Sequence, residues 1–176
     1  AEGGHFIFHD NRQLPDNITA IFKFPDFISK YEVRMGNTFV AEGLPERVDR
    51  SHGIFFYGTN GTLFVNRSRC LVMANHGKTI DPPIGQDGQP IPLDSEYNGR
   101  GDDVHVRNFF ECIRSRQDPT ATIEDGRHAT DICLAANIAY QTGKRLDWNP
   151  TTGTTSEPSA APLLRLIYRE PWRLEF

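Results

Sequence analysis

Apolar and polar residues alternate with a period of two through much of the first third of the chain. In residues 17–24 one side carries four apolar residues, Ile18, Ala20, Phe22 and Phe24. In residues 29–36 the same alternation sets Tyr31, Val33 and Met35 against Lys30, Glu32 and Arg34. This period predicts half-buried strands of an antiparallel sheet, and the weaker alternation in residues 5–10 indicates a further strand.

Two apolar runs in residues 53–65 flank the sequence Gly58-Thr59-Asn60-Gly61. Asn-Gly supplies the positive φ angles that tight hairpin turns need, so this segment predicts a β-hairpin. The following residues 70–75, "CLVMAN", predict one more strand.

Residues 77–101 are rich in Gly, Pro and Asp and predict a long surface loop. Loops of this length are uncommon unless they have a role. The segment therefore either borders a ligand or a subunit contact, or it is a tolerated insertion.

Helical periodicity occurs twice in the second half of the chain. The first helix is predicted from about Asp103 to Arg116, and the second from about Asp125 to Thr142, with Gly143 as its C-terminal cap. Strands followed by helices predict an α+β fold, with an open, predominantly antiparallel β-sheet and helices packed on one face.

The end of the chain divides into two parts. Residues 149–162 resemble a linker, whereas residues 163–176, "LLRLIYREPWRLEF", are too apolar for a free tail. We therefore expect an α+β domain over residues 1–148, and a linker and C-terminal segment over residues 149–176 that packs back on the same domain.

Composition narrows the classes of partner. The chain has 176 residues, of which 38% are hydrophobic, and a formal net charge of −4. Basic residues are scattered among acidic ones, which argues against nucleic acid as a partner, and no apolar run is long enough to span a membrane. The N-terminus lacks the pattern of a signal peptide, which favours the cytoplasm and leaves open periplasmic export of a longer parent.

The stretch 102–116, "DDVHVRNFFECIRSR", concentrates side chains that carry chemistry. A helical wheel separates it into three stripes. The core stripe holds four apolar residues, Val106, Phe109, Phe110 and Ile113. The solvated stripe holds Arg107, Glu111 and Arg114, and a half-buried stripe beside the core holds His105, Asn108, Cys112 and Arg116. Asp102 or Asp103 is positioned to cap the helix.

His105 and Asn108 are the candidate substrate-binding residues. They lie one turn apart near a helix start, where backbone donors and the helix dipole favour anionic or hydroxyl-rich ligands. The alternative is a role in capping and packing. A nucleophilic pair of Cys112 with His105 is disfavoured, because seven residues of helix separate the two by about 10 Å along the axis.

The second helix is apolar almost all round, which predicts burial on most of its sides. His128 lies on its core side and is interpreted as a hydrogen-bonded structural histidine. The three cysteines, Cys70, Cys112 and Cys133, are interpreted as small apolar core residues rather than a disulfide or zinc site. No GxGxxG sequence precedes a helix, and no GxSxG sequence occurs.

Several segments taken together resemble a known family. They are "HGIFFYGTNGTLFVNR", "HVRNFFECIRSRQDPTATIEDGRHATDICLAANIAYQTGKRLDWNP", the terminal "YREPWRLEF" and the opening "GGHFIFHDNRQLPDNITAIFKFP". In this order they resemble the C-terminal domain of the Gfo/Idh/MocA oxidoreductases, over nearly the whole chain.

The resemblance implies a parent protein in which a Rossmann domain precedes this α+β domain. That parent would use NAD or NADP for hydride transfer on a sugar-like or polyol substrate, and the sheet of this domain would supply substrate-side contacts and a homo-oligomer interface. The family's glycine-rich loop and its catalytic-lysine motif are missing from this sequence, and no residue matches a catalytic position. The resemblance therefore implies an excised domain that holds no cofactor and is not catalytically competent alone.

Two other hypotheses stay open. One is a free-standing carbohydrate-binding or scaffold module that reuses the fold. The other is a domain of an NAD-dependent enzyme that cleaves glycosides.

Overall fold

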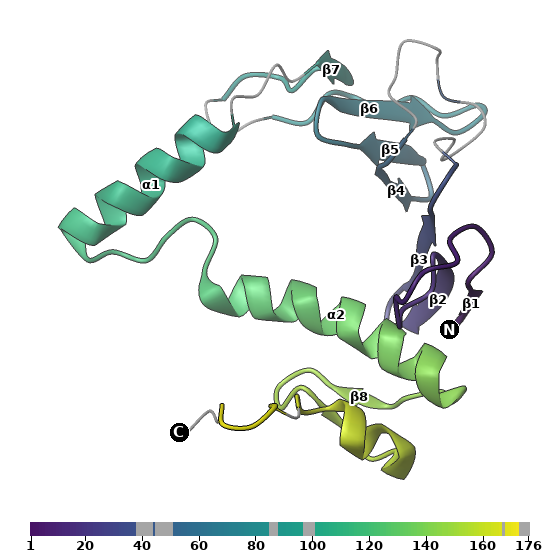
Figure 1. Ribbon diagram of the computed structural model, residues 1–176. Coiled ribbons are helices and arrows are strands. Elements are labelled where there is room, and N and C mark those ends of the chain that lie inside the picture. Colours follow the sequence, from purple (N-terminus) through teal and green to yellow (C-terminus); the bar gives the residue numbers. More distant parts are fainter. Residues whose placement is uncertain (38–43, 45–50, 85–87, 97–100, 167, 173–176) are drawn as a thin grey trace. The chain divides into compact units, whose positions relative to one another are not determined.

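The chain forms open antiparallel sheets and two main helices, and none of the sheets closes into a barrel (Figure 1). This confirms the predicted α+β class. The computed structural model describes residues 1–37, 44, 51–84, 88–96, 101–166 and 168–172. The chain divides into two compact units, Ala1–Met35 with Asp118–Phe176, and Gly36–Gln117.

The first unit contains a three-stranded sheet, a long helix and a small C-terminal group of elements. The strands are β1 (Glu2–Gly4), β2 (Asn17–Lys23) and β3 (Ile28–Arg34), in the order β1-β2-β3. The remaining elements are α2 (Ile123–Thr142), β8 (Trp148–Asn149), β9 (Thr154–Thr155) and the 3₁₀ helix η1 (Pro158–Leu163).

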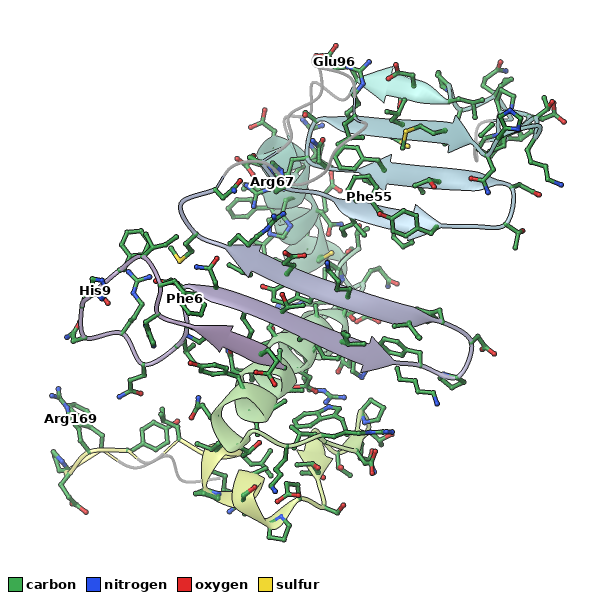
Figure 2. The ribbon with its side chains drawn as sticks, turned by 90° about the vertical axis from the view of Figure 1, so that its right-hand side faces the viewer. Phe6, His9, Phe55, Arg67, Glu96 and Arg169 are labelled. Carbon is green, nitrogen blue, oxygen red and sulfur yellow. The ribbon has the colours of Figure 1, made fainter. Side chains whose placement is uncertain are left out.

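The period-two pattern of β2 and β3 decides which face of this sheet is covered. The register sets Ile18 opposite Val33 and Ala20 opposite Tyr31, so the predicted apolar sides of both strands share one face. Ile18 and Ala20 are buried together with Ala136 of α2, which passes behind the sheet in Figure 2. The strand predictions for residues 17–24 and 29–36 are therefore confirmed.

Helix α2 begins two residues before the predicted start because of a capping box. The Thr122 hydroxyl accepts a hydrogen bond from the Asp125 backbone N–H, and the Asp125 carboxylate accepts one from the Thr122 N–H. The helix ends, as predicted, at Gly143, whose φ of 63° is the left-handed conformation that glycine adopts most easily.

Burial along α2 differs from the prediction. Only Ala135, Ala136 and Ile138 are buried, whereas Ile132 and Leu134 are exposed. The expectation that α2 is buried on most sides is wrong for this chain, because the three-stranded sheet provides partners only for the C-terminal half of the helix.

The second unit contains a four-stranded sheet and a helix. The strands are β4 (Ile54–Tyr57), β5 (Gly61–Val65), β6 (Arg69–Ala74) and β7 (Asp94–Glu96), in the order β4-β5-β6-β7, and the helix is α1 (Gly101–Ser115). The predicted hairpin is confirmed as β4–β5, with the Gly58 N–H donating to the Gly61 carbonyl at 2.8 Å. Asn75 ties the turn to the end of β6 through its side-chain amide, which donates to the Gly58 and Thr59 carbonyls.

The core of this sheet centres on Phe64, which is fully buried. Leu44 and Leu71 are buried with it, and Phe55 packs against it with 4.8 Å between ring centroids. All of these β-sheet residues lie on one face, since the register sets Phe64 opposite both Phe55 and Leu71.

The segment predicted as a long loop, residues 77–101, contains some regular structure. Strand β7 pairs with β6, and the Arg69 guanidinium holds the Asp94 carboxylate at 2.6 Å across the two strands. Ile84 forms an isolated bridge with Pro90. Residues 85–87 and 97–100 lie outside the described residues, and a role for this segment at a ligand or subunit contact stays a prediction.

Helix α1 has the predicted apolar stripe, but the chain does not bury it. Val106, Phe109, Phe110 and Ile113 are all exposed, so their assignment to a core face is wrong within this chain. The pattern identifies which side of the helix is apolar, but burial also requires a covering surface, and none of the described residues buries this side.

The C-terminal segment follows the small β8–β9 pair. Helix η1 lies against α2, and its Ala160 is fully buried. Leu166, Tyr168 and Trp172 are exposed, and residues 167 and 173–176 lie outside the described residues. The division at residue 148, and packing of residues 163–176 back on the domain, stay predictions.

Replacing Phe64 tests the core of the second unit. Phe64→Ala leaves a cavity under the sheet, and we expect it to lower the free energy of unfolding by about 3 to 5 kcal/mol in urea denaturation. Phe56→Ala, measured at a protein concentration low enough for a monomeric chain, is the matched control, since the same residue type lies on the opposite face of the same hairpin and is 56% exposed. Equal losses for the two variants would contradict the assignment of the faces.

Candidate functional site

The two predicted ligand-binding residues lie on the N-terminal half of α1. His105 is exposed, whereas Asn108 is half-buried, as is Cys112 one turn further along. The predicted half-buried stripe therefore holds for Asn108 and Cys112 but not for His105 or for Arg116, which is exposed and follows the last residue of α1. Contact of His105 and Asn108 with a substrate stays a prediction.

The start of α1 is acidic. The helix begins at Gly101, so Asp102 and Asp103 lie within its first turn rather than at the N-cap position predicted for them. Their carboxylates already complement the positive end of the helix dipole. A neutral, hydroxyl-rich ligand therefore suits this end of the helix better than an anionic one.

A site that sequence reasoning missed is the loop between β1 and β2. Asp16 is fully buried. Among the residues that the structure describes, no other polar or charged residue is buried. Its carboxylate accepts hydrogen bonds from the backbone N–H groups of Phe6, Ile7 and Phe8 at 2.9 to 3.1 Å. The Asn17 side-chain amide donates a fourth, at 2.7 Å.

This arrangement explains why residues 5–10 do not form the predicted strand. The N–H groups that would pair with a neighbouring strand are directed at one carboxylate instead, and the chain curls around it. Strand β1 consequently ends at Gly4, before the predicted segment, and the alternation prediction for residues 5–10 is wrong.

The hydrogen bonds also decide the charge of Asp16. Burial removes the carboxylate from water and by itself would raise its pKa, but the N–H donors of Phe8, Phe6 and Ile7 and the Asn17 amide outweigh that effect. The pKa of Asp16 is held well below its usual range, so the group is ionised at neutral pH.

A second charged pair stiffens the same loop. The Arg12 guanidinium binds both oxygens of Asp10 at 2.7 and 2.8 Å, and this contact is the main cause that lowers the pKa of Asp10 to about 2. The guanidinium also lies 4.5 Å from the centre of the Phe8 ring, a cation–π contact.

The remaining candidates do not assemble into a catalytic group. His128 is exposed rather than on the core side, although it is hydrogen-bonded, since Arg127 Nη2 lies 2.8 Å from its Nε2. Because a guanidinium only donates, His128 must accept with Nε2. Cys133 is exposed, which contradicts its assignment to the core, while Cys70 and Cys112 are half-buried. Within the described part of the chain, no cluster of His, Cys, Asp and Glu is arranged to hold a metal ion.

The four-stranded sheet has one wholly apolar outer face on its first three strands. Directly paired residues place seven side chains there, Ile54, Phe56, Leu63, Val65, Cys70, Val72 and Ala74, the last of which is opposite Gly61. At the hairpin end, Phe56, Leu63, Val72 and Ile80 line a shallow open depression of about 400 Å³. Ile54 and Phe56 are more than half exposed.

Comparisons with known proteins do not assign this chain to a family. Comparisons with protein-family models, with curated proteins and with solved structures each found no match. Among the helices that the structure describes, none is long and apolar enough to cross a membrane.

The role of Asp16 can be tested by an isosteric change. Asp16→Asn removes the charge and replaces one acceptor oxygen by a donor, so we expect faster hydrogen exchange at the amides of Phe6, Ile7 and Phe8.

Since folding lowers the pKa of Asp16, its stabilising effect is present above the unfolded-state pKa of about 3.9 and is lost as the pH falls below it. The stability difference between the wild type and Asp16→Asn should therefore shrink between about pH 5 and about pH 2 in urea denaturation.

Asp10→Asn is the control for this prediction. Its carboxylate lies in the same loop but binds the half-buried Arg12 rather than those amides, so the exchange of the amides of residues 6–8 should change little. Unchanged exchange in Asp16→Asn would contradict the assigned role.

Proposed function

We propose that this chain is the substrate-side and oligomerisation domain of an NAD(P)-dependent oxidoreductase that acts on a sugar-like or polyol substrate. The proposal rests on the resemblance to the C-terminal domain of the Gfo/Idh/MocA oxidoreductases, whose segments follow one another along nearly the whole chain. The open antiparallel sheets and the two main helices are compatible with that domain.

The structural observation that supports the oligomerisation part of the proposal is the contrast between the outer faces of the two larger sheets. On β3, Glu32 binds Lys30 at 2.7 Å and Arg34 at 3.1 Å, so the outer face of the three-stranded sheet carries ion pairs beside the exposed Ile21 and Ile28. The outer face of β4, β5 and β6 is apolar at all of its paired positions. Continuous apolar surface of this kind marks contacts with other molecules.

The contrast assigns different roles to the two surfaces. The apolar face of the four-stranded sheet is the homo-oligomer interface in this proposal, because association buries apolar area without desolvating charges. Helix α1, with His105 and Asn108 on its N-terminal half, is the substrate-side element. NAD or NADP would be held by the Rossmann domain of the parent, not by this chain.

The sequence upstream of Ala1 distinguishes this proposal from its rivals. We expect a continuous reading frame that encodes a nucleotide-binding domain. A start codon at that point would favour a free-standing carbohydrate-binding or scaffold module instead. Cleavage of nitrophenyl glycosides by the full-length protein would indicate the glycoside-cleaving branch.

Isothermal titration calorimetry tests the assignment of the cofactor to the parent's other domain. We expect no saturable heat when NAD, NADH, NADP or NADPH is added to this chain at micromolar to millimolar concentrations. An NAD-dependent dehydrogenase measured under the same conditions is the positive control. Saturable micromolar binding to this chain would contradict the proposal.

Sedimentation equilibrium tests the oligomer interface. Phe56→Glu places an unpaired carboxylate on the apolar face, so it should weaken self-association by at least about tenfold, which corresponds to about 1.4 kcal/mol. Phe27→Glu is the matched control, because Phe27 is exposed to a similar extent, 59% against 56%, but lies at the turn between β2 and β3. A chain that stays monomeric at high concentration, or equal effects of the two variants, would contradict the interface.

A further inference from the structure

Phe6 combines high exposure with a fixed support. Its side chain is 70% exposed. A Cβ atom added to Gly4 would lie 2.5 Å from Cζ and 2.9 Å from Cε1 of the Phe6 ring, so the ring rests directly on the backbone of Gly4. The Phe6 ring therefore has a support beneath it at the end of β1 and a wide surface open to solvent.

The loop that carries Phe6 is held at several points. The backbone N–H of Phe6 donates to both oxygens of Asp16, and the next two N–H groups donate to the same carboxylate. The Asp16 N–H also donates to the Gly4 carbonyl, which ties the support of the ring to the carboxylate that holds its backbone. A side chain fixed in this way loses little conformational entropy when it binds a ligand.

The charges of the loop indicate what kind of ligand fits. Three successive backbone N–H groups commonly form an anion-binding nest, but here Asp16 fills it. Asp10 and Arg12 neutralise each other at 2.7 Å. Both features disfavour phosphates and other charged ligands, while His5 and His9, on either side of the apolar residues 6–8, offer ring nitrogens for hydrogen bonds to hydroxyl groups.

We propose that Phe6 is a stacking platform for the ring of a neutral saccharide, with Gly4 as its support and Asp16 as the residue that positions it. The C–H groups on one face of a pyranose ring match the negative face of an aromatic ring, and its hydroxyl groups remain at the rim for hydrogen bonding. This inference rests on the proposed function for the sugar-like class of ligand, and it assigns a second saccharide contact to the loop between β1 and β2, independent of the contact proposed on α1.

The test is an NMR titration of the full chain with neutral saccharides, namely the methyl glycosides of glucose, galactose and mannose. We expect saturable shifts of the Phe6 ring and of the amides of residues 4–8 with at least one of them. Phe6→Ala should weaken that binding roughly fivefold to tenfold, and Phe6→Trp should retain it. Gly4→Ala should weaken binding although the aromatic ring is kept, because the added methyl group displaces the ring from its support.

The controls separate stacking from general effects. Phe27→Ala removes another exposed aromatic ring, which stacks on Phe24 at the turn between β2 and β3, and should leave the affinity unchanged. Inorganic phosphate should not shift the amides of residues 6–8, because Asp16 occupies their donors. Unchanged resonances of β2 in each variant show that the sheet is intact.

The outcomes that overturn the inference are distinct from those that overturn the proposed function. No shift with any of the three saccharides, shifts confined to other residues, or equal affinity of Phe6→Ala and the wild type would each overturn it. So would preferential binding of a proline-rich peptide at Phe6. The cofactor titration and the sedimentation of Phe56→Glu do not depend on Phe6, so the proposed function stands or fails on those measurements.

Discussion

Asp16 joins three parts of the first unit. Its carboxylate oxygens accept from the N–H groups of residues 6–8, its backbone N–H donates to the Gly4 carbonyl at the end of β1, and its backbone carbonyl accepts from the Met35 N–H just beyond β3. A buried carboxylate without donors would be strongly destabilising, so the loop can close over Asp16 only if its backbone supplies them. The course of the chain from β1 into β2 follows from this requirement.

The two larger sheets share the same alternation of inward and outward side chains but differ in the residues on their outer faces. In each, one face contributes buried side chains, which pack with α2 in the first unit and with Leu44 around Phe64 in the second. The other face carries the Lys30–Glu32–Arg34 ion pairs in the first unit but only apolar side chains on β4, β5 and β6 in the second. The open apolar face is the basis of the proposed homo-oligomer interface. The loop fixed by Asp16 is the basis of the proposed saccharide contact, because it presents Phe6 without a further cost of ordering.

Local patterns are sufficient to predict the elements whose stability is local. Strands β2 and β3, the β4–β5 hairpin and the C-terminal cap of α2 at Gly143 each follow from a period of two, an Asn-Gly turn or a glycine with positive φ. The apolar stripe of α1 also follows from its sequence. The burial of that stripe does not, because burial depends on a covering surface that is distant in sequence.

The candidate sites also show that a sequence reveals local relations more readily than contacts between distant residues. His105 and Asn108 are neighbours on one helix, which is a local relation that a sequence reveals. The Asp16 site depends on a carboxylate and three amides eight to ten residues away, and a Pro-Asp-Asn sequence by itself indicates only a turn. The available signal is indirect, since three consecutive apolar residues close to Gly3 and Gly4 fit a half-buried strand poorly.

The hydrogen bonds to Asp16 can be observed directly. NMR experiments on the isotopically labelled chain detect scalar coupling across such hydrogen bonds. We predict coupling from the amide nitrogens of Phe6, Ile7 and Phe8 to the side-chain carboxylate carbon of Asp16. Absence of such coupling, together with rapid exchange of the same three amides with solvent, would contradict the central role of this carboxylate.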